Sequence, residues 1–261
     1  MSQNLILGRG KAYFDLYAPG TQNTTGRRYL GNSPELAIDI ATTQLDHYSS
    51  DQGLKIKDDS VILQLDRKGT FKTDEISNEN MQLFLIGTFQ TQTQTSGTAS
   101  TSTMLAAKLD RYYQIGVTTG NPSGVRNISA VVVKDDAVTP HTYVLNTDYT
   151  VDLTLGLLYI VPTAGSFVDG TTNIVVTYNT AATTRQQVQT TAIAAIDGAF
   201  SFISYNPKGV QRDYYMPYVR MTPNGAFALK GDVWQEISFN LEILLKDPSM
   251  SHIYVDGRPL T

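Results

Sequence analysis

The residues best suited to catalysis or metal binding are scattered along this sequence. Its three histidines, His47, His141 and His252, are far apart, and none has a second histidine at the i, i+4 spacing of a metal-binding helix. The chain has no cysteine, which excludes disulfides, thiol catalysis and cysteine-ligated zinc. We therefore expect no metal and no cofactor.

The acidic residues offer no acid/base pair either. Adjacent acids in a strand point to opposite faces, so a turn or helix start explains them better than catalysis. The sequence also lacks a nucleophile elbow, a phosphate-binding lysine loop and a dinucleotide fingerprint. We expect a protein that is not an enzyme. The adjacent acids are Asp58-Asp59, Asp74-Glu75 and Asp135-Asp136.

Composition points to β-structure with polar faces. Of the 261 residues, 41% are hydrophobic but only 17% are charged, below the usual ~25%. The net charge of −4 argues against a sequence-specific nucleic-acid binder, which normally carries a basic stripe. No stretch matches a signal peptide or a membrane span. We expect a soluble protein made in a cytoplasm.

Apolar and polar residues alternate in several segments, and period two predicts strands with one buried and one polar face. Mostly antiparallel β-structure with one packed helix follows from this pattern. The apolar members of the alternating runs are Ala12, Phe14 and Leu16; Leu36, Ile38 and Ile40; Val61, Leu63 and Leu65; and Ile237, Phe239, Leu241 and Ile243.

One helix is predicted from Ser77 to Ile86. Ser77 is a suitable N-cap, acids precede it, and Gly87 is a suitable stop. Its apolar face, which would cover an open side of a sheet, comprises Met81, Phe84 and Leu85.

Two polar joints divide the chain. Residues 88–103, rich in Thr, Gln and Ser, are compatible with a surface linker or with a strand paired to a neighbour. Residues 179–187 form the second joint. We predict a core from residues 1–113 and 181–261, and an inserted β-rich domain over residues 114–180. Between Ile40 and Leu54 lies a long polar arm that requires a partner.

The order of these features resembles the major tail tube proteins of long-tailed bacteriophages, which are related to the tube protein of type VI secretion systems. The resemblance covers most of the chain. It rests on Arg28–Asn32, Glu35–Ile40, Leu45–Ser50, Leu54–Phe71 and Thr73–Met81, and later on Asp148–Asp152, Gly156, Tyr159-Ile160, Val168–Gly170, Ser204–Gly209, Tyr218–Met221 and the strand after Trp234.

The resemblance implies a β-sandwich or barrel-like subunit of two packed antiparallel sheets with one flanking helix. Such subunits form homo-hexameric rings that stack into a tail tube in the virion, assembled in the host bacterial cytoplasm, through which double-stranded DNA is ejected. It also implies tape measure, tail terminator and tail tip partners, and a sheath if the tail contracts. The inserted domain would lie on the exterior. An arm between subunits or rings would use Leu45, His47, Tyr48, Leu54 and Ile56.

DNA passage calls for a lumen without free cations, because phosphates attract Lys and Arg. We hypothesise that Asp39, Glu236 and Glu242 face the channel. A second interpretation is a carbohydrate-binding β-sandwich of a tail tip or fibre. The fifteen tyrosines, clustered at Tyr112-Tyr113 and Tyr214-Tyr215, suit either glycan stacking or protein contacts.

Overall fold

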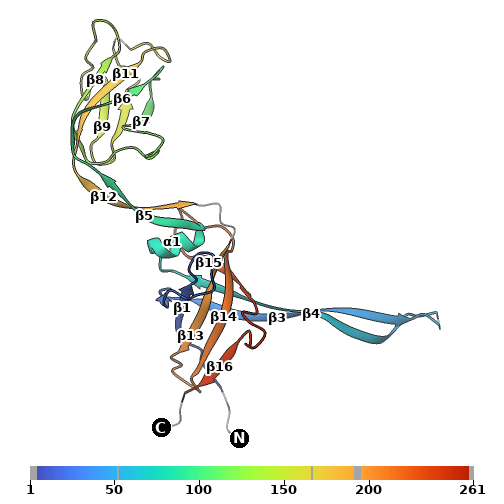
Figure 1. Ribbon diagram of the computed structural model, residues 1–261. Helices are drawn as coiled ribbons and strands as arrows, with labels where there is room; N and C mark the ends of the chain where they lie inside the picture. Colours follow the sequence, from blue (N-terminus) through green and yellow to red (C-terminus); the bar gives the residue numbers. More distant parts are fainter. Residues whose placement is uncertain (1–4, 52, 166, 191–194, 259–261) are drawn as a thin grey trace. The chain divides into compact units, whose positions relative to one another are not determined.

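The computed structural model describes residues 5–51, 53–165, 167–190 and 195–258. This part is mainly β, with 54% of residues in strands and 3% in helix, so the predicted mainly β class with antiparallel sheets and one helix is confirmed. The chain forms two compact units (Figure 1). We call residues 1–90 and 187–261 the core unit, and residues 91–186 the inserted unit.

The described strands of the core unit form one eight-stranded antiparallel sheet. Its order is β2-β1-β13-β14-β15-β4-β3, and β16 pairs with β14. The strands are β1 (Gly10–Leu16), β2 (Arg28–Tyr29), β3 (Glu35–Ser49), β4 (Ile56–Thr73), β13 (Ile196–Ser204), β14 (Arg212–Pro223), β15 (Ile237–Ile243) and β16 (Tyr254–Gly257).

This sheet curls over its apolar face. Strands β13 and β4 are separated by β14 and β15, a path of ~14 Å at the usual strand spacing. Yet the ring centroids of Phe200 on β13 and Phe71 on β4 are 5.7 Å apart. Phe71 also stacks on Phe239 at 6.1 Å. The fold therefore encloses one aromatic core between strands that are not neighbours in the sheet.

Helix α1 (Asn78–Phe84) packs against β14 and β15. The predicted N-cap is confirmed, because the Ser77 side chain accepts from the Asn80 backbone N–H. The buried face differs from the prediction: Leu83 and Asn80 are buried, whereas Leu85 is exposed. The Asn80 amide donates to the carbonyls of Leu30 and Glu75, at 2.9 and 2.8 Å, which turns this face inward.

Strand β1 departs from the predicted alternation at its end. Ala12 and Phe14 are buried, but Leu16 is exposed and Tyr17 is buried instead. The Tyr17 hydroxyl donates to the Pro217 carbonyl, and burial raises its pKa to about 12. A hydrogen bond that the sequence pattern does not reveal thus changes which side chain points inward.

The inserted unit is a small sandwich with its own core. One three-stranded sheet has the order β6-β11-β8 and the other β7-β10-β9. Buried residues from both sheets form a single cluster that includes Ile115, Val133, Leu158 and Ile174. The strands are β6 (Gly97–Met104), β7 (Arg111–Gln114), β8 (Ile128–Asp135), β9 (Tyr149–Asp152), β10 (Leu157–Ile160) and β11 (Ile174–Thr180).

The inserted unit is longer than predicted, because residues 91–113 belong to it. Within 88–103 the linker interpretation is wrong and the strand alternative is correct. β5 (Gly87–Gln94) pairs with β12 (Thr183–Thr190), and β6 pairs with β11. Alternating Thr and Ser suit a ladder, and the partner strands come from residues far along the chain.

Strands β3 and β4 form one long hairpin, which extends past the other strands of the core unit in Figure 1. Its register runs from Glu35 opposite Lys72 to Ser49 opposite Ile56, with two irregularities. The predicted polar arm between Ile40 and Leu54 is therefore not a separate segment, because β3 continues past Ile40 to Ser49. The polar residues after Ile40 form a cross-strand ladder instead.

Two alanine substitutions on β4 compare how much the buried core and the exposed hairpin contribute to the free energy of unfolding. Phe71 has 0% exposure, so Phe71→Ala should lower the free energy of unfolding by about 3–5 kcal/mol. Leu63 is 63% exposed, and Leu63→Ala should change it by less than about 0.5 kcal/mol. Urea unfolding of dilute protein measures both values. A large loss for Leu63→Ala would mean that the hairpin is covered within a single chain.

Candidate assembly surface

The hairpin of β3 and β4 exposes ten large apolar side chains. A soluble monomer rarely leaves such a set uncovered, and extended apolar patches mark interaction sites. The exposed residues are Ile38, Ile40, Leu45, Tyr48, Leu54, Ile56, Val61, Ile62, Leu63 and Leu65.

Part of this apolar surface continues the core. Residues opposite each other in the register share a face, and faces alternate along a strand. Leu36 pairs with Phe71, Ile38 with Gly69, and Thr42 with Leu65. Leu36, Ile38, Ile40 and Leu65 thus lie on the face of the buried Phe71. We call these four residues the apolar stripe.

The opposite face of the sheet carries a row of alternating charge across five strands. In the register, Asp39 lies opposite Lys68, Lys68 opposite Glu242, Glu242 opposite Arg220, and Arg220 opposite Asp197. We call these five residues the charge row. The Arg220 Nε donates to Asp197 Oδ1 at 2.9 Å, and this partner raises the pKa of Arg220 further above its usual range.

Cations of this face also have acidic partners beyond the row. Lys72 Nζ lies 2.7 Å from Glu35 Oε2, and that carboxylate raises the pKa of Lys72. Lys68 Nζ lies 3.6 Å from Asp66 Oδ2. These pairs are partly exposed, so each contributes little to stability. As a result, each of the three cations named on this face, Lys68, Lys72 and Arg220, has an acidic partner.

The five residues predicted for the arm, Leu45, His47, Tyr48, Leu54 and Ile56, all lie in the hairpin and are exposed. Leu45 pairs with Val61, and Tyr48 pairs with Lys57. Around them His47 Nδ1 lies 2.6 Å from Asp58 Oδ1, and Lys57 Nζ lies 2.6 Å from Asp46 Oδ1. The hydrogen bonds from Lys57 and Ser60 lower the pKa of Asp46.

Sequence reasoning missed the rest of the apolar surface. The alternation predicts Val61, Leu63 and Leu65 on the buried face of a strand, but all three are exposed. Period two identifies the strand and its apolar face. It carries no signal for whether residues of the same chain cover that face.

The acids predicted for a channel lie on the polar side of the sheet. Asp39 and Glu242 flank Lys68 in the charge row. Glu236 precedes β15 and is exposed. The sequence prediction did not include the cations between the acids, so the face is mixed in charge rather than purely acidic.

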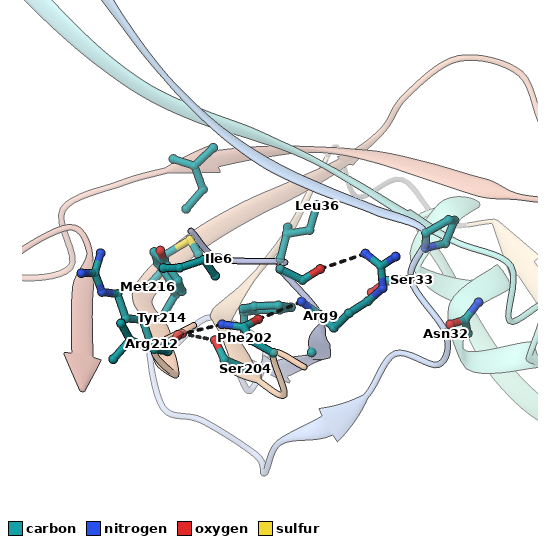
Figure 2. A pocket seen from close by; sticks show the side chains of 16 residues that line it. Ile6, Arg9, Asn32, Ser33, Leu36, Phe202, Ser204, Arg212, Tyr214 and Met216 are labelled. Atoms are coloured by element: carbon teal, nitrogen blue, oxygen red, sulfur yellow. Dashed lines mark hydrogen bonds between the residues drawn. The ribbon is translucent and has the colours of Figure 1, made fainter. Parts of the chain in front are cut away.

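A groove of about 750 Å³ opens beside the base of the hairpin (Figure 2). Leu36 and Ile38 line it from β3, Phe202 and Met216 from β13 and β14, and Arg9 and Arg212 are its cations. Sequence reasoning did not find this groove, because its walls come from four separate segments.

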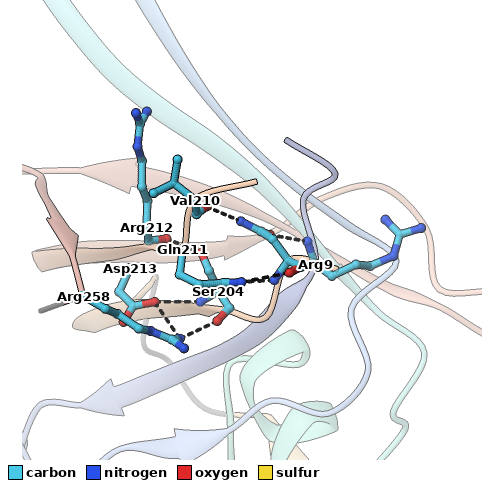
Figure 3. Close-up of polar contacts among 8 residues, drawn as sticks. Arg9, Ser204, Val210, Gln211, Arg212, Asp213 and Arg258 are labelled. Atoms are coloured by element: carbon cyan, nitrogen blue, oxygen red, sulfur yellow. Dashed lines mark hydrogen bonds and ion pairs between the residues drawn. The ribbon is translucent and has the colours of Figure 1, made fainter. Parts of the chain in front are cut away.

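Polar contacts connect the chain segments that carry Arg9 and Arg212 at the two sides of the groove (Figure 3). The Arg9 backbone N–H donates to Asn206 Oδ1 at 2.9 Å, and the Ser204 backbone N–H donates to Asp213 Oδ1 at 2.8 Å. Arg258 Nη2 pairs with the same Asp213 oxygen at 3.3 Å. The Asp213 carboxylate thus accepts a hydrogen bond from Ser204 and forms an ion pair with Arg258.

The inserted unit has a tyrosine pair, one ring exposed and the other half-buried, on the outer face of its β7-β10-β9 sheet. Tyr112 and Tyr159 face each other in the register, with ring centroids 4.6 Å apart. The Tyr159 hydroxyl donates to Asp110 Oδ1 at 2.7 Å, and Tyr112 is 67% exposed. The two rings, inclined at 31° to each other, form an aromatic surface beside a carboxylate.

In the described part of the chain, the other two histidines, His141 and His252, lie beside residues of the fold and not in a cluster of ligating side chains. His141 packs its ring against Tyr143 at 5.0 Å, while burial and Arg67 lower the pKa of His252. Within the described ranges, no three His, Asp or Glu side chains are grouped so that they could hold a metal ion. No helix in the same ranges is long and apolar enough to span a membrane.

Comparison with curated proteins gives no match. A family model does match the chain over residues 5–200, which is more than half of its length and includes the hairpin, helix α1 and the inserted unit. That family is described as proteins of unknown function, UCP028589. The chain therefore belongs to this family of unknown function.

Proposed function

We propose that this protein is a structural subunit that assembles with copies of itself into stacked, hexameric rings, forming the tail tube of a bacteriophage. The observation that carries the proposal is the hairpin of β3 and β4, with its ten exposed apolar side chains. Burial of a large apolar side chain stabilises by about 1.5–3 kcal/mol, so covering even part of this surface favours association strongly.

The edge of the sheet supports a self-assembling role. β3 is an edge strand of 15 residues, and its outer side has no strand partner among the described residues. Long unprotected edges favour pairing with another chain, and monomeric proteins usually block them. In a ring, the edge of one subunit would meet the sheet of the next. This head-to-tail contact repeats and closes by rotation.

The charge row supports a passive conduit for DNA. Phosphates bind free Lys and Arg, so a channel must neutralise the cations that it exposes. On the polar face Lys68 lies between Asp39 and Glu242, and Arg220 between Glu242 and Asp197. We propose that this face lines the lumen and that its acids keep the cations from holding DNA.

Electron microscopy of the purified protein tests the main proposal. The wild-type chain should form rings or tubes with a central hole, and Leu63→Asp should abolish them, because a charge at a buried contact is costly. Leu229→Asp, at another exposed leucine of the core unit, is the matched control and should leave assembly intact. Featureless wild-type monomers at high concentration would overturn the proposal.

A second experiment addresses the lumen. In assembled rings, Asp39→Asn with Glu242→Gln removes both acids that flank Lys68 and should increase retention of double-stranded DNA. This retention should fall as salt is raised, with a slope that steepens by about 1 for each additional phosphate that the face binds.

The control variant, Asp232→Asn with Asp256→Asn, changes the net charge equally at exposed positions outside the charge row. Equal DNA retention by both variants in gel-shift or filter-binding assays would contradict the assignment of this face to the lumen.

A second candidate function is carbohydrate binding by the inserted unit. The Tyr112–Tyr159 pair beside Asp110, with the Tyr112 ring exposed, favours it, since sugar rings stack on aromatic faces and their hydroxyls donate to carboxylates. Saturable binding to an oligosaccharide array, lost in Tyr112→Ala but kept in Tyr205→Ala, would support this candidate. An array without signal for the wild-type chain would exclude it for the sugars tested.

A further inference from the structure

We propose that the distal hairpin of one copy, defined as residues 42–65, docks in the groove of Figure 2 on a second copy. This inference rests on the proposed function and names the acceptor site of the contact. Each chain carries both surfaces: an apolar, acidic segment that is exposed in its described residues, and an apolar groove with cations at its side.

The groove combines an apolar surface with available positive charge. Leu36, Ile38, Phe202 and Met216 line it together with Arg9 and Arg212. Among the described residues, no carboxylate lies within ion-pair distance of either of these arginines. The nearby Asp213 is paired with Arg258 instead. The groove therefore suits a segment that brings both apolar side chains and carboxylates.

The distal hairpin has this composition. It carries four aspartates, at 46, 51, 58 and 59, against two lysines, at 55 and 57, so its formal charge is −2. Asp46 and Asp58 are engaged by Lys57 and His47. No cation within the described ranges lies at ion-pair distance from Asp51 or Asp59. These two acids are available for Arg9 and Arg212.

A chain cannot place its own distal hairpin in its own groove. Ile38 lines the groove, and Ser49 lies eleven positions further along the same strand, or about 36 Å away in extended conformation. Folding back would break the continuous β3–β4 ladder. The occupant is therefore the distal hairpin of a second copy, and each copy offers one hairpin and one groove.

The groove is also continuous with the apolar stripe, because Leu36 and Ile38 belong to both. An incoming hairpin would extend the apolar contact from the groove onto the base of the neighbour's hairpin. Since hairpin and groove are different surfaces, the contact is head-to-tail and propagates from copy to copy.

Disulfide trapping tests this contact, because the chain has no native cysteine. Leu54→Cys places a thiol at a 73% exposed position of the distal hairpin, and Val210→Cys places one at the groove. The two variants, one carrying a mass tag, are mixed and mildly oxidised. A tagged–untagged dimer should form within the assembly, since docking brings the Cα atoms toward the ~4.4–6.8 Å that a disulfide requires.

The matched control replaces Val210→Cys by Val138→Cys, which is fully exposed in the inserted unit and should give no cross-linked dimer. Charge exchange provides a second, independent readout. Arg212→Glu should weaken docking by about two- to fivefold, as expected for an exposed ion pair, and Asp59→Arg on the partner copy should restore it.

The outcomes separate the two proposals. Rings or tubes that form without Leu54–Val210 cross-links and without response to Arg212→Glu would overturn the groove assignment and leave the tube proposal standing. Wild-type protein that does not assemble, together with Leu54→Cys and Val210→Cys variants that do not cross-link, would overturn both. Equal cross-linking to Val138→Cys would show random collision and would also overturn the groove assignment.

Discussion

One apolar face, carried by strands β3 and β4, determines both the fold and the proposed assembly. At its inner end Phe71 packs with Phe200 and Phe239 in the closed core. The same face continues outward through Ile38 and Ile40, which the described part of the chain leaves exposed. Residues of one strand thus experience two environments. The buried end stabilises the single chain, whereas the exposed end gains its stabilisation only when another molecule covers it.

This division explains how far the sequence could predict the structure. Period two correctly identified the strands around Phe14, Leu63 and Phe239, and capping chemistry correctly placed the start of α1 at Ser77. Local patterns do not report what covers a face, so Leu63 and Phe239 look alike in sequence but differ in exposure. The groove was beyond prediction for a related reason. Arg9 and Arg212 line the same groove only because strands that are distant in the sequence pair in the folded chain.

In the inserted unit, too, partners that are distant in the sequence decide the local structure. Its Thr- and Ser-rich segments resemble a linker, but they become ladder strands because β11 and β12 supply partners. At its base, the Gln94 side chain donates to the carbonyls of Arg126 and Ala181 and accepts from the Arg126 backbone N–H. The chain enters and leaves this unit once each, and the unit has a hydrophobic core of its own. The core cluster around Phe71 and the cluster of this unit share no residue.

As the proposed wall of a DNA channel, the polar face would have to satisfy two requirements that conflict. A row of carboxylates alone would repel itself across neighbouring strands, and like charges placed opposite each other destabilise a sheet. A row of cations would hold the phosphates of any DNA that passes. Alternation from Asp39 through Lys68, Glu242 and Arg220 to Asp197 resolves the conflict. Each cation is opposed by acids on both neighbouring strands, and the row ends in an acid on each side. The sheet can therefore remain stable while the face that it presents stays free of unneutralised positive charge along this row.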